Sequence, residues 1–312
     1  MTSDVRPVTT GAWAPPDAAL VAVVVTVCLA AAVVQSSHVG LDAPVLVLLA
    51  ARAAGSLAAA AVVGCLLLSL WQGVRPALVA SSSGWALLWV LCLVVGLGVE
   101  LLSSGASDHG GTGPAAADEA ARVRWLVVGV ALATLARVLS GAVQRAADVR
   151  IVLGVVIVAL VATTSTGHAG SKTATVLLVA HVLAATAWVG GLLAIVLHGP
   201  AMWRSGAGPA AVRAYSRLAL LCFLGLAASG LLGLAARTGP AALLAGRDYL
   251  ALVVLKLGIL VLLGAAGAYH RRVWLHRLET GGRTGFLVLS SGELVLMTAA
   301  LGLAATLSHT AS

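Results

Sequence analysis

The chain has 312 residues, of which 60% are hydrophobic and only 10% are charged, and its formal net charge is +8 at pH 7. Soluble domains carry roughly 25% charged residues, so this composition excludes an ordinary soluble domain and predicts an integral membrane protein. Basic cytoplasmic loops that set topology and contact anionic lipid explain the positive charge. Nothing in the sequence favours nucleic-acid binding.

About nine apolar stretches follow one another along the chain, each long enough to cross the roughly 30 Å of hydrocarbon in a bilayer. A backbone in lipid must satisfy its own hydrogen bonds, so we expect each stretch to be an α-helix. The predicted fold is an all-α, polytopic membrane bundle of about nine transmembrane helices. The predicted helices are Ala18–Gln35, Val45–Leu70, Trp85–Ser103, Val123–Val143, Ile151–Thr166, Thr173–Leu197, Leu218–Ala236, Tyr249–Tyr269 and Phe286–Leu307.

Lys and Arg are unevenly distributed between alternate loops. Most arginines fall in the loops on one side, and this asymmetry predicts that the amino terminus lies inside and the carboxyl terminus outside. A short charged connector at Gln144–Arg150 separates four predicted helices from five. We therefore predict an N-terminal four-helix membrane region at residues 1–150 and a five-helix membrane domain at residues 151–312.

Ionisable side chains inside the predicted helices need an explanation, because each costs on the order of 2.5–3.5 kcal/mol at the bilayer centre. The depths of Arg52 and Lys256 on the outer side allow either to pair with Glu100, and Arg137 and Glu293 are a possible pair on the inner side. Interhelical ion pairs and snorkelling side chains are the structural explanations that stay open.

Most of the histidines fall toward the predicted outer side. His38, His109, His168 and His309 lie in outer loops or at helix ends, and His181 lies roughly 12 Å below the outer face. Imidazole is a good ligand for copper, zinc, iron and nickel, so this arrangement predicts metal capture followed by inward passage. Solvated loop histidines, and a core histidine bonded to a neighbouring helix, are the alternatives.

The remaining histidines, His198, His270 and His276, accompany arginines on the predicted inner side, where we expect them in the headgroup region. The four cysteines fall inside predicted helices, and we expect small buried hydrophobic side chains there rather than ligands. The sequence has no His-Glu-x-x-His, Cys-x-x-Cys or methionine cluster, and no phosphate loop that would support ATP-driven pumping.

Several short motifs in the second half of the chain occur together. They are Thr166-Gly167-His168-Ala169, His181, Trp188-Val189-Gly190-Gly191, Tyr215-Ser216-Arg217-Leu218-Ala219, Ser229-Gly230, Lys256 and Gly292-Glu293-Leu294-Val295-Leu296-Met297. Over Gly167 to Leu307 this combination resembles the copper resistance protein D (CopD-like) membrane domain. The first four helices, with Arg52-Ala53-Ala54-Gly55-Ser56, look similar to the amino-terminal part of longer family members.

The resemblance implies a multi-pass protein of the bacterial cytoplasmic membrane that takes copper into the cell and contributes to copper homeostasis or resistance. It implies no catalysis, and we predict that the chain is not an enzyme. By position, His168 and His181 are expected to contact the metal, with His309 as a third ligand. Structural or gating roles are expected for Trp188, Arg52, Arg217, Lys256 and Glu293. The expected partners are the lipid bilayer and a periplasmic or extracellular copper-binding protein.

Two other functions stay open at this point. Histidines on adjacent transmembrane helices can ligate a haem axially, so a haem-binding electron-transfer protein is the main alternative. That alternative needs a second histidine facing His181 at the same depth, and the sequence shows no evident one. A copper-delivery accessory protein for oxidase assembly is the other alternative, and sequence alone does not separate it from transport.

Overall fold

The computed structural model describes residues 43–72, 76–104, 114–165, 172–237, 247–274 and 283–310. Within these ranges the chain forms eight α-helices and one short π-helical turn, and no strand occurs. The all-α prediction is therefore confirmed for the described residues. The elements are α2 (Ala43–Gln72), α3 (Pro76–Ser104), α4 (Pro114–Leu139), α5 (Ala146–Ser165), α6 (Lys172–Arg204), α7 (Gly208–Arg237), α8 (Arg247–Tyr269), η1 (His270–Trp274) and α10 (Arg283–Thr310).

Several helices are longer than the apolar pattern predicts. α3 begins at Pro76 and α4 at Pro114, because proline is well tolerated at the first helical position, where its missing N–H is not needed. The polar residues 81–83 continue α3, since each serine hydroxyl donates to a carbonyl of the preceding turn. α6 likewise continues past the predicted end through Pro200 to Arg204.

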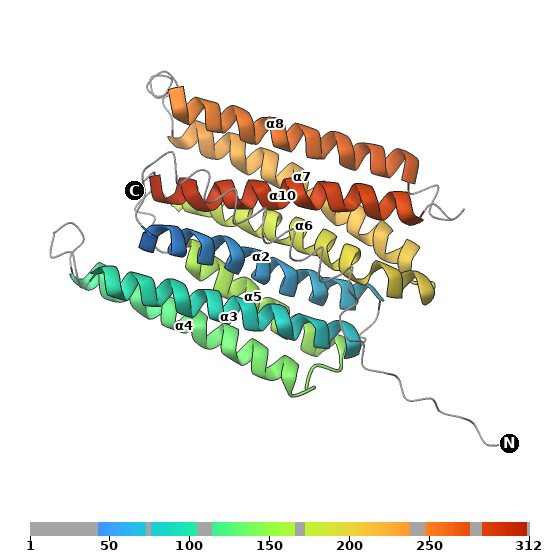
Figure 1. The fold of residues 1–312 in the computed structure, drawn as a ribbon, viewed down its shortest axis with the longest axis horizontal. Coiled ribbons are helices and arrows are strands. Elements are labelled where there is room, and N and C mark those ends of the chain that lie inside the picture. Colours follow the sequence, from blue (N-terminus) through green and yellow to red (C-terminus); the bar gives the residue numbers. More distant parts are fainter. Residues whose placement is uncertain are drawn as a thin grey trace.

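The helices lie side by side, and consecutive helices run in alternating directions (Figure 1). α2 and α6 pack against each other at the centre of the bundle, and each also contacts α5, α7 and α10. α3 covers α2 on one side and α4 covers α3, whereas α8 contacts α7 and α10 on the other side. The core is therefore built around α2 and α6.

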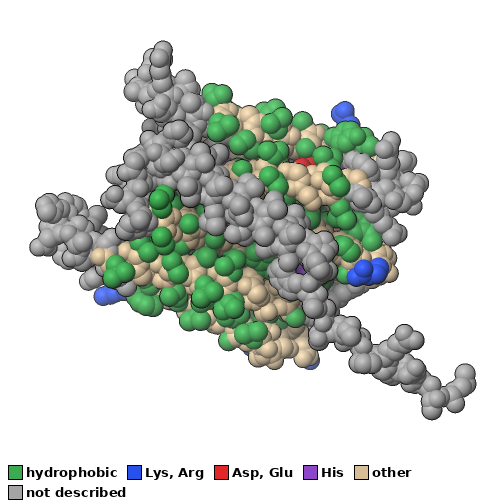
Figure 2. All heavy atoms as spheres, in the orientation of Figure 1, with side chains coloured by type: hydrophobic (Ala, Val, Ile, Leu, Met, Phe, Trp, Pro, Cys, Tyr) green, Lys and Arg blue, Asp and Glu red, His purple; other side chains and the backbone are tan. Residues whose placement is uncertain are grey.

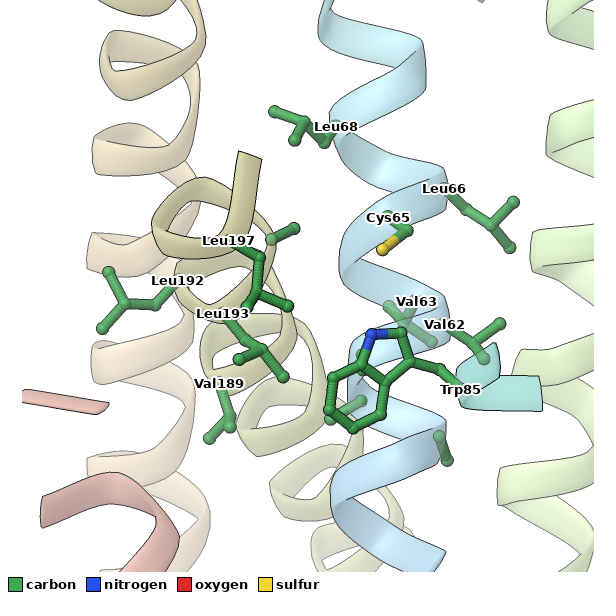
Figure 3. Close-up of a cluster of buried hydrophobic side chains, with 14 of the residues drawn as sticks. Val62, Val63, Cys65, Leu66, Leu68, Trp85, Val189, Leu192, Leu193 and Leu197 are labelled. Atoms are coloured by element: carbon green, nitrogen blue, oxygen red, sulfur yellow. The ribbon is translucent and has the colours of Figure 1, made fainter. Parts of the chain in front are cut away.

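The backbones of α2 and α6 are in direct contact at two glycines. A Cβ atom added to Gly64 would lie 1.8 Å from the carbonyl oxygen of Gly190, and one added to Gly190 would lie 1.9 Å from that of Ala60. Helices in lipid gain little from the hydrophobic effect, so small residues that allow close van der Waals contact favour their association. Buried side chains of α2 and α6, with Trp85 of α3, fill the space around this crossing (Figure 3).

The outer surface of the bundle suits a lipid environment. Large apolar side chains such as Leu102, Val158, Leu221 and Val261 are exposed, and apolar side chains cover much of the described surface in Figure 2. Five described helices are long and apolar enough to cross a bilayer, within Leu46–Gln72, Leu78–Glu100, Ala146–Ser165, Lys172–Arg204 and Gly208–Gly233. The chain is therefore a multi-pass membrane protein.

The total of about nine spans stays a prediction. Helices occupy the other predicted stretches, but Ala18–Gln35 lies outside the described residues. The division between residues 1–150 and 151–312 also stays a prediction. It falls just after the start of α5, close to Gly141, which turns the chain with a φ of 66°.

The two ends of the bundle differ in charge. We call the end where α2, α4, α6 and α8 finish the basic end, because most described arginines lie toward it. They are Arg137, Arg145, Arg150, Arg204, Arg213, Arg217, Arg271 and Arg272. In Figure 2 the Lys and Arg side chains are confined to the margins of the molecule. The positive-inside rule predicts that the basic end faces the cytoplasm.

The glycine crossing gives a first testable prediction. Gly190→Ala puts a methyl group where the Ala60 carbonyl stands, so α2 and α6 must separate, and we expect a loss of roughly 1–3 kcal/mol or more of unfolding free energy. Thermal or denaturant unfolding of the purified protein measures it. Gly154→Ala in α5 is the matched control, because an added Cβ there meets nothing within 4 Å. Equal stability of the two variants would contradict the backbone contact.

The orientation can be tested with two tags. A tag inserted after Gly141, which is exposed between α4 and α5, is expected to be reached by antibody only after spheroplasts are permeabilised. A tag at the carboxyl terminus is expected to be reached in intact spheroplasts, because the five helices α5, α6, α7, α8 and α10 lie between the two tags and an odd number of crossings puts the tags on opposite sides of the membrane. The reverse pattern would mean that the basic end faces outward.

Candidate functional site

His181 is the predicted metal ligand whose side chain the structure describes. It lies on α6, partly buried, and its Nδ1 atom is 3.0 Å from the hydroxyl oxygen of Ser229 on α7. Ser229 donates its only hydroxyl proton to the Gly225 carbonyl at 2.6 Å. The Ser229 oxygen therefore accepts a hydrogen bond from Nδ1–H, and the lone pair of the ring is then on Nε2, the tautomer that suits metal binding.

The structure does not test the other two predicted ligands. His168 lies outside the described residues, and His309 belongs to α10 while its side chain lies outside those described. The grouping of His168, His181 and His309 therefore stays a prediction. In the part of the chain that the structure describes, no three His, Cys, Asp or Glu side chains gather as a metal-binding group.

The predicted charged pair at the outer side is confirmed in part. Arg52 of α2 donates from Nη2 to Oε1 of Glu100 on α3 at 2.8 Å, and Arg124 of α4 contacts the other oxygen of the same carboxylate. The two arginines balance the charge of the Glu100 carboxylate, and the three side chains together link α2, α3 and α4. Lys256 belongs to α8, but its side chain lies outside those described.

The predicted pairing of Arg137 with Glu293 is wrong. Arg137 lies 3.9 Å from Asp148, across the connection from α4 to α5. Glu293 of α10 instead faces His270, with 2.9 Å between His270 Nδ1 and Glu293 Oε1, and the two side chains are only 12% and 8% exposed. Matching depth along the helices identifies the pair of Arg52 and Glu100, but it fails for Glu293, because Glu293 faces η1.

The pair of His270 and Glu293 is buried and incompletely satisfied. The two facing atoms are close but not aligned as a hydrogen bond, and neither Glu293 Oε1 nor His270 Nε2 has a hydrogen-bond partner among the described residues. Phe286 covers the imidazole with ring centroids 5.2 Å apart. The ring of His270 is therefore packed between helices near the basic end, and its expected headgroup location stays a prediction.

His198 is also packed between helices, and its expected headgroup location stays a prediction. His198 is partly buried on α6, where its Nε2 atom lies 3.0 Å from the hydroxyl oxygen of Ser81 on α3 and 3.9 Å from the sulfur of Cys65 on α2. No spacing in the sequence connects these residues, because they come from three different helices. Only the packing of α2, α3 and α6 brings them together.

Trp188 and Arg217 occupy different environments. Trp188 is buried, with its indole edge-on to Phe223 at 6.1 Å between centroids, and its carbonyl accepts a hydrogen bond from Tyr215 at 3.2 Å. The Tyr215 ring rests against Gly191, so Trp188 lies in a packed contact between α6 and α7. Arg217 lies on α7 toward the basic end and is exposed.

The interior on one side of α6 is apolar. A cavity of about 200 Å³ lies between α2, α5, α6 and α7, and Thr186 is the one polar residue among those that line it. The cavity borders residues close to His181, such as Leu183, and residues close to Cys65, such as Val63. Apart from the Thr186 hydroxyl, no polar side chain lines this cavity. The imidazoles of His181 and His198 are therefore separated by apolar packing.

A haem clamped between described histidines does not fit the geometry. His181 and His198 lie on the same helix, roughly 25 Å apart along its axis at about 1.5 Å per residue, so they cannot be the two axial ligands of one haem. The third described histidine, His270, directs Nδ1 at Glu293. Among the described residues, therefore, no pair of histidines is placed for axial ligation.

These features define a multi-pass helical membrane protein with imidazoles held at separate points inside its bundle. Residues 209–307 match the family model described as copper resistance protein D. The resemblance predicted from the motifs is confirmed for this stretch, which is similar to a copper-resistance membrane family. Comparison with curated proteins and with solved structures gives no match.

The matched stretch is shorter than the motifs predict. It begins at Pro209 and so contains Arg217, Lys256, His270 and Glu293, but neither His168 nor His181, and it ends before His309. The family match therefore supports the class of protein without assigning the three predicted ligands.

The contact of His270 with Glu293 can be measured by a double-mutant cycle. His270→Ala and Glu293→Ala each leave a buried polar group unpaired, and we expect each to lower the unfolding free energy by about 1–3 kcal/mol. The double variant should lose less unfolding free energy than the sum of the two single losses, by roughly 0.5–3 kcal/mol. The control pair, His270→Ala with Glu100→Ala, should be additive, since Glu100 contacts Arg52 near the opposite end. Additivity in both cycles would show that the pair is uncoupled.

Proposed function

We propose that this protein carries copper ions, its substrate, across the bacterial cytoplasmic membrane into the cell, and so contributes to copper homeostasis or resistance. The observation that carries the proposal is the His181 imidazole inside the bundle, held by Ser229 in the tautomer that presents Nε2. The match of residues 209–307 to the copper resistance protein D family supports copper as the ion.

An ion entering from the outer side would first meet imidazoles at the ends of helices. We assign this capture to His168 and His309, and the next contact to His181 on α6. The donor is a periplasmic or extracellular copper-binding protein. The proposed passage requires no catalytic step, only ligand exchange from one imidazole to the next.

The charged residues have supporting roles in this proposal. Arg52, Glu100 and Arg124 hold α2, α3 and α4 together, while Trp188 fixes the contact of α6 with α7. Glu293 brings a buried carboxylate to the basic end, where it offsets the charge of a passing cation. Lys256 and Arg217 balance charge on α8 and α7.

Copper accumulation by sealed vesicles that contain only this protein tests the proposal. We expect uptake by the wild type, and a loss of at least tenfold in initial rate for His181→Ala, because a metal ligand is removed. Ser229→Ala leaves the imidazole but frees its orientation, so a loss of roughly tenfold or more in apparent affinity is expected.

The matched control is His276→Ala, which also removes one imidazole and is expected to transport like the wild type. Unchanged uptake by His181→Ala would remove the central residue from the mechanism. Vesicles that accumulate no copper at all, although the purified protein binds it, would instead favour the accessory role in copper delivery to an oxidase. A strong visible haem absorption in the purified protein would favour the electron-transfer alternative.

A further inference from the structure

Three polar side chains from three helices meet in the half of the bundle nearer the basic end. Cys65 of α2 is 1% exposed, and its sulfur lies 3.9 Å from Nε2 of His198 on α6. Ser81 of α3 lies 3.0 Å from the same nitrogen and 3.7 Å from the same sulfur. Figure 3 shows the Cys65 sulfur pointing from α2 toward α6, into a surrounding of Val, Leu and Trp side chains.

We propose that Cys65 and His198 bind a single Cu(I) ion between α2 and α6, with Ser81 beside the two ligands. The inference rests on the proposed function for the identity of the ion. It adds a second metal contact, which neither the family match nor the sequence motifs include, because Cys65 and His198 both lie outside residues 209–307.

The distance between the two ligand atoms suits one bridging ion. Metal bonds of about 2.3 Å to a thiolate and about 2.0 Å to an imidazole span up to roughly 4.3 Å when the ligands lie on opposite sides of the ion. A separation of 3.9 Å therefore allows both bonds at a wide angle without movement of either helix. The thiolate ligand favours Cu(I), because soft ligands such as cysteine select this ion.

The contacts of the Cys65 sulfur in the metal-free cluster are long, at 3.7 Å to Ser81 and 3.9 Å to His198. Ser81 has one hydroxyl proton, and the Leu78 carbonyl accepts it at 2.8 Å, so that proton is not shared equally with Cys65 and His198. The thiol and the imidazole thus face each other in an apolar part of the bundle with weak mutual contact at 3.9 Å. An ion bonded to both atoms replaces this weak contact with two strong ones.

Binding of one Cu(I) ion releases one proton, which comes from the Cys65 thiol. The S–H bond of Cys65 breaks, the sulfur forms a bond to Cu(I), and the proton leaves to the solvent. Without the metal, Nε2–H of His198 donates to the Ser81 oxygen, whose own proton goes to the Leu78 carbonyl. On binding, His198 stays neutral: its proton moves from Nε2 to Nδ1, and the Nε2 lone pair bonds the metal. Copper keeps its oxidation state throughout, so no oxidant or reductant is consumed.

The cluster lies further along α6 than His181, nearer the basic end. His181 lies in the half of α6 away from the basic end, and His198 lies roughly 25 Å further along the same helix at about 1.5 Å per residue. An ion released from the outer histidines would thus reach a soft ligand pair before it leaves at the basic end. The cluster is an inner acceptor that favours the reduced ion.

The test uses the purified full-length protein, titrated anaerobically with Cu(I) against a chromogenic Cu(I) chelator, and X-ray absorption of the bound copper. We expect the wild type to bind one more Cu(I) ion than Cys65→Ser, and sulfur scattering to disappear in that variant. His198→Asn should weaken the same ion by tenfold or more. The matched control is Cys92→Ser on α3, a partly exposed cysteine that should bind like the wild type.

Each outcome is decisive. Equal stoichiometry for the wild type and Cys65→Ser, or copper with nitrogen and oxygen ligands alone, would overturn the proposal. Cys65→Ala provides a second variant should Cys65→Ser fail to fold, and size-exclusion profiles identify such a failure. Wild-type vesicles that take up no copper, while the Cys65-dependent ion still binds, would refute transport and leave the site standing.

Discussion

The contact of α2 with α6 through Gly64 and Gly190 is the constraint on which the rest of the structure depends. Because each glycine faces a backbone carbonyl of the other helix at a distance that no side chain permits, the two helices approach as closely as helices can. The other described helices pack around this pair. Gly64 directly precedes Cys65, so the same contact fixes the distance from Cys65 to α6 and hence to His198.

Polar groups inside the bundle are placed at the joints between helices. His181 meets Ser229 between α6 and α7, His198 meets Ser81 and Cys65 between α6, α3 and α2, and His270 meets Glu293 between η1 and α10. A polar group in hydrocarbon is costly without a partner, and each joint supplies at least one close polar neighbour. The proposed copper contacts use two joints on the same helix, with apolar packing between them.

Much of the fold follows from the sequence, whereas the partners of the polar residues mostly do not. Long apolar stretches identify the helices, and matching depth identifies Arg52 and Glu100 as a pair. Depth alone misassigns Glu293, because the choice between Arg137 and His270 depends on the rotation of α10 about its axis and on its neighbours. Those neighbours follow from which helices pack together, and no local pattern encodes that for Cys65 or His198.

The crossing at Gly190 also makes this residue the point about which α6 can tilt against α2. The fulcrum lies between His181 and His198, so any tilt of the helix against α2 swings the two imidazoles in opposite directions. A rotation of α6 about this crossing would therefore displace both imidazoles. A rigid rod on a fixed pivot would thus make the occupancy of one end felt at the far end, without any relay of side chains through the apolar middle.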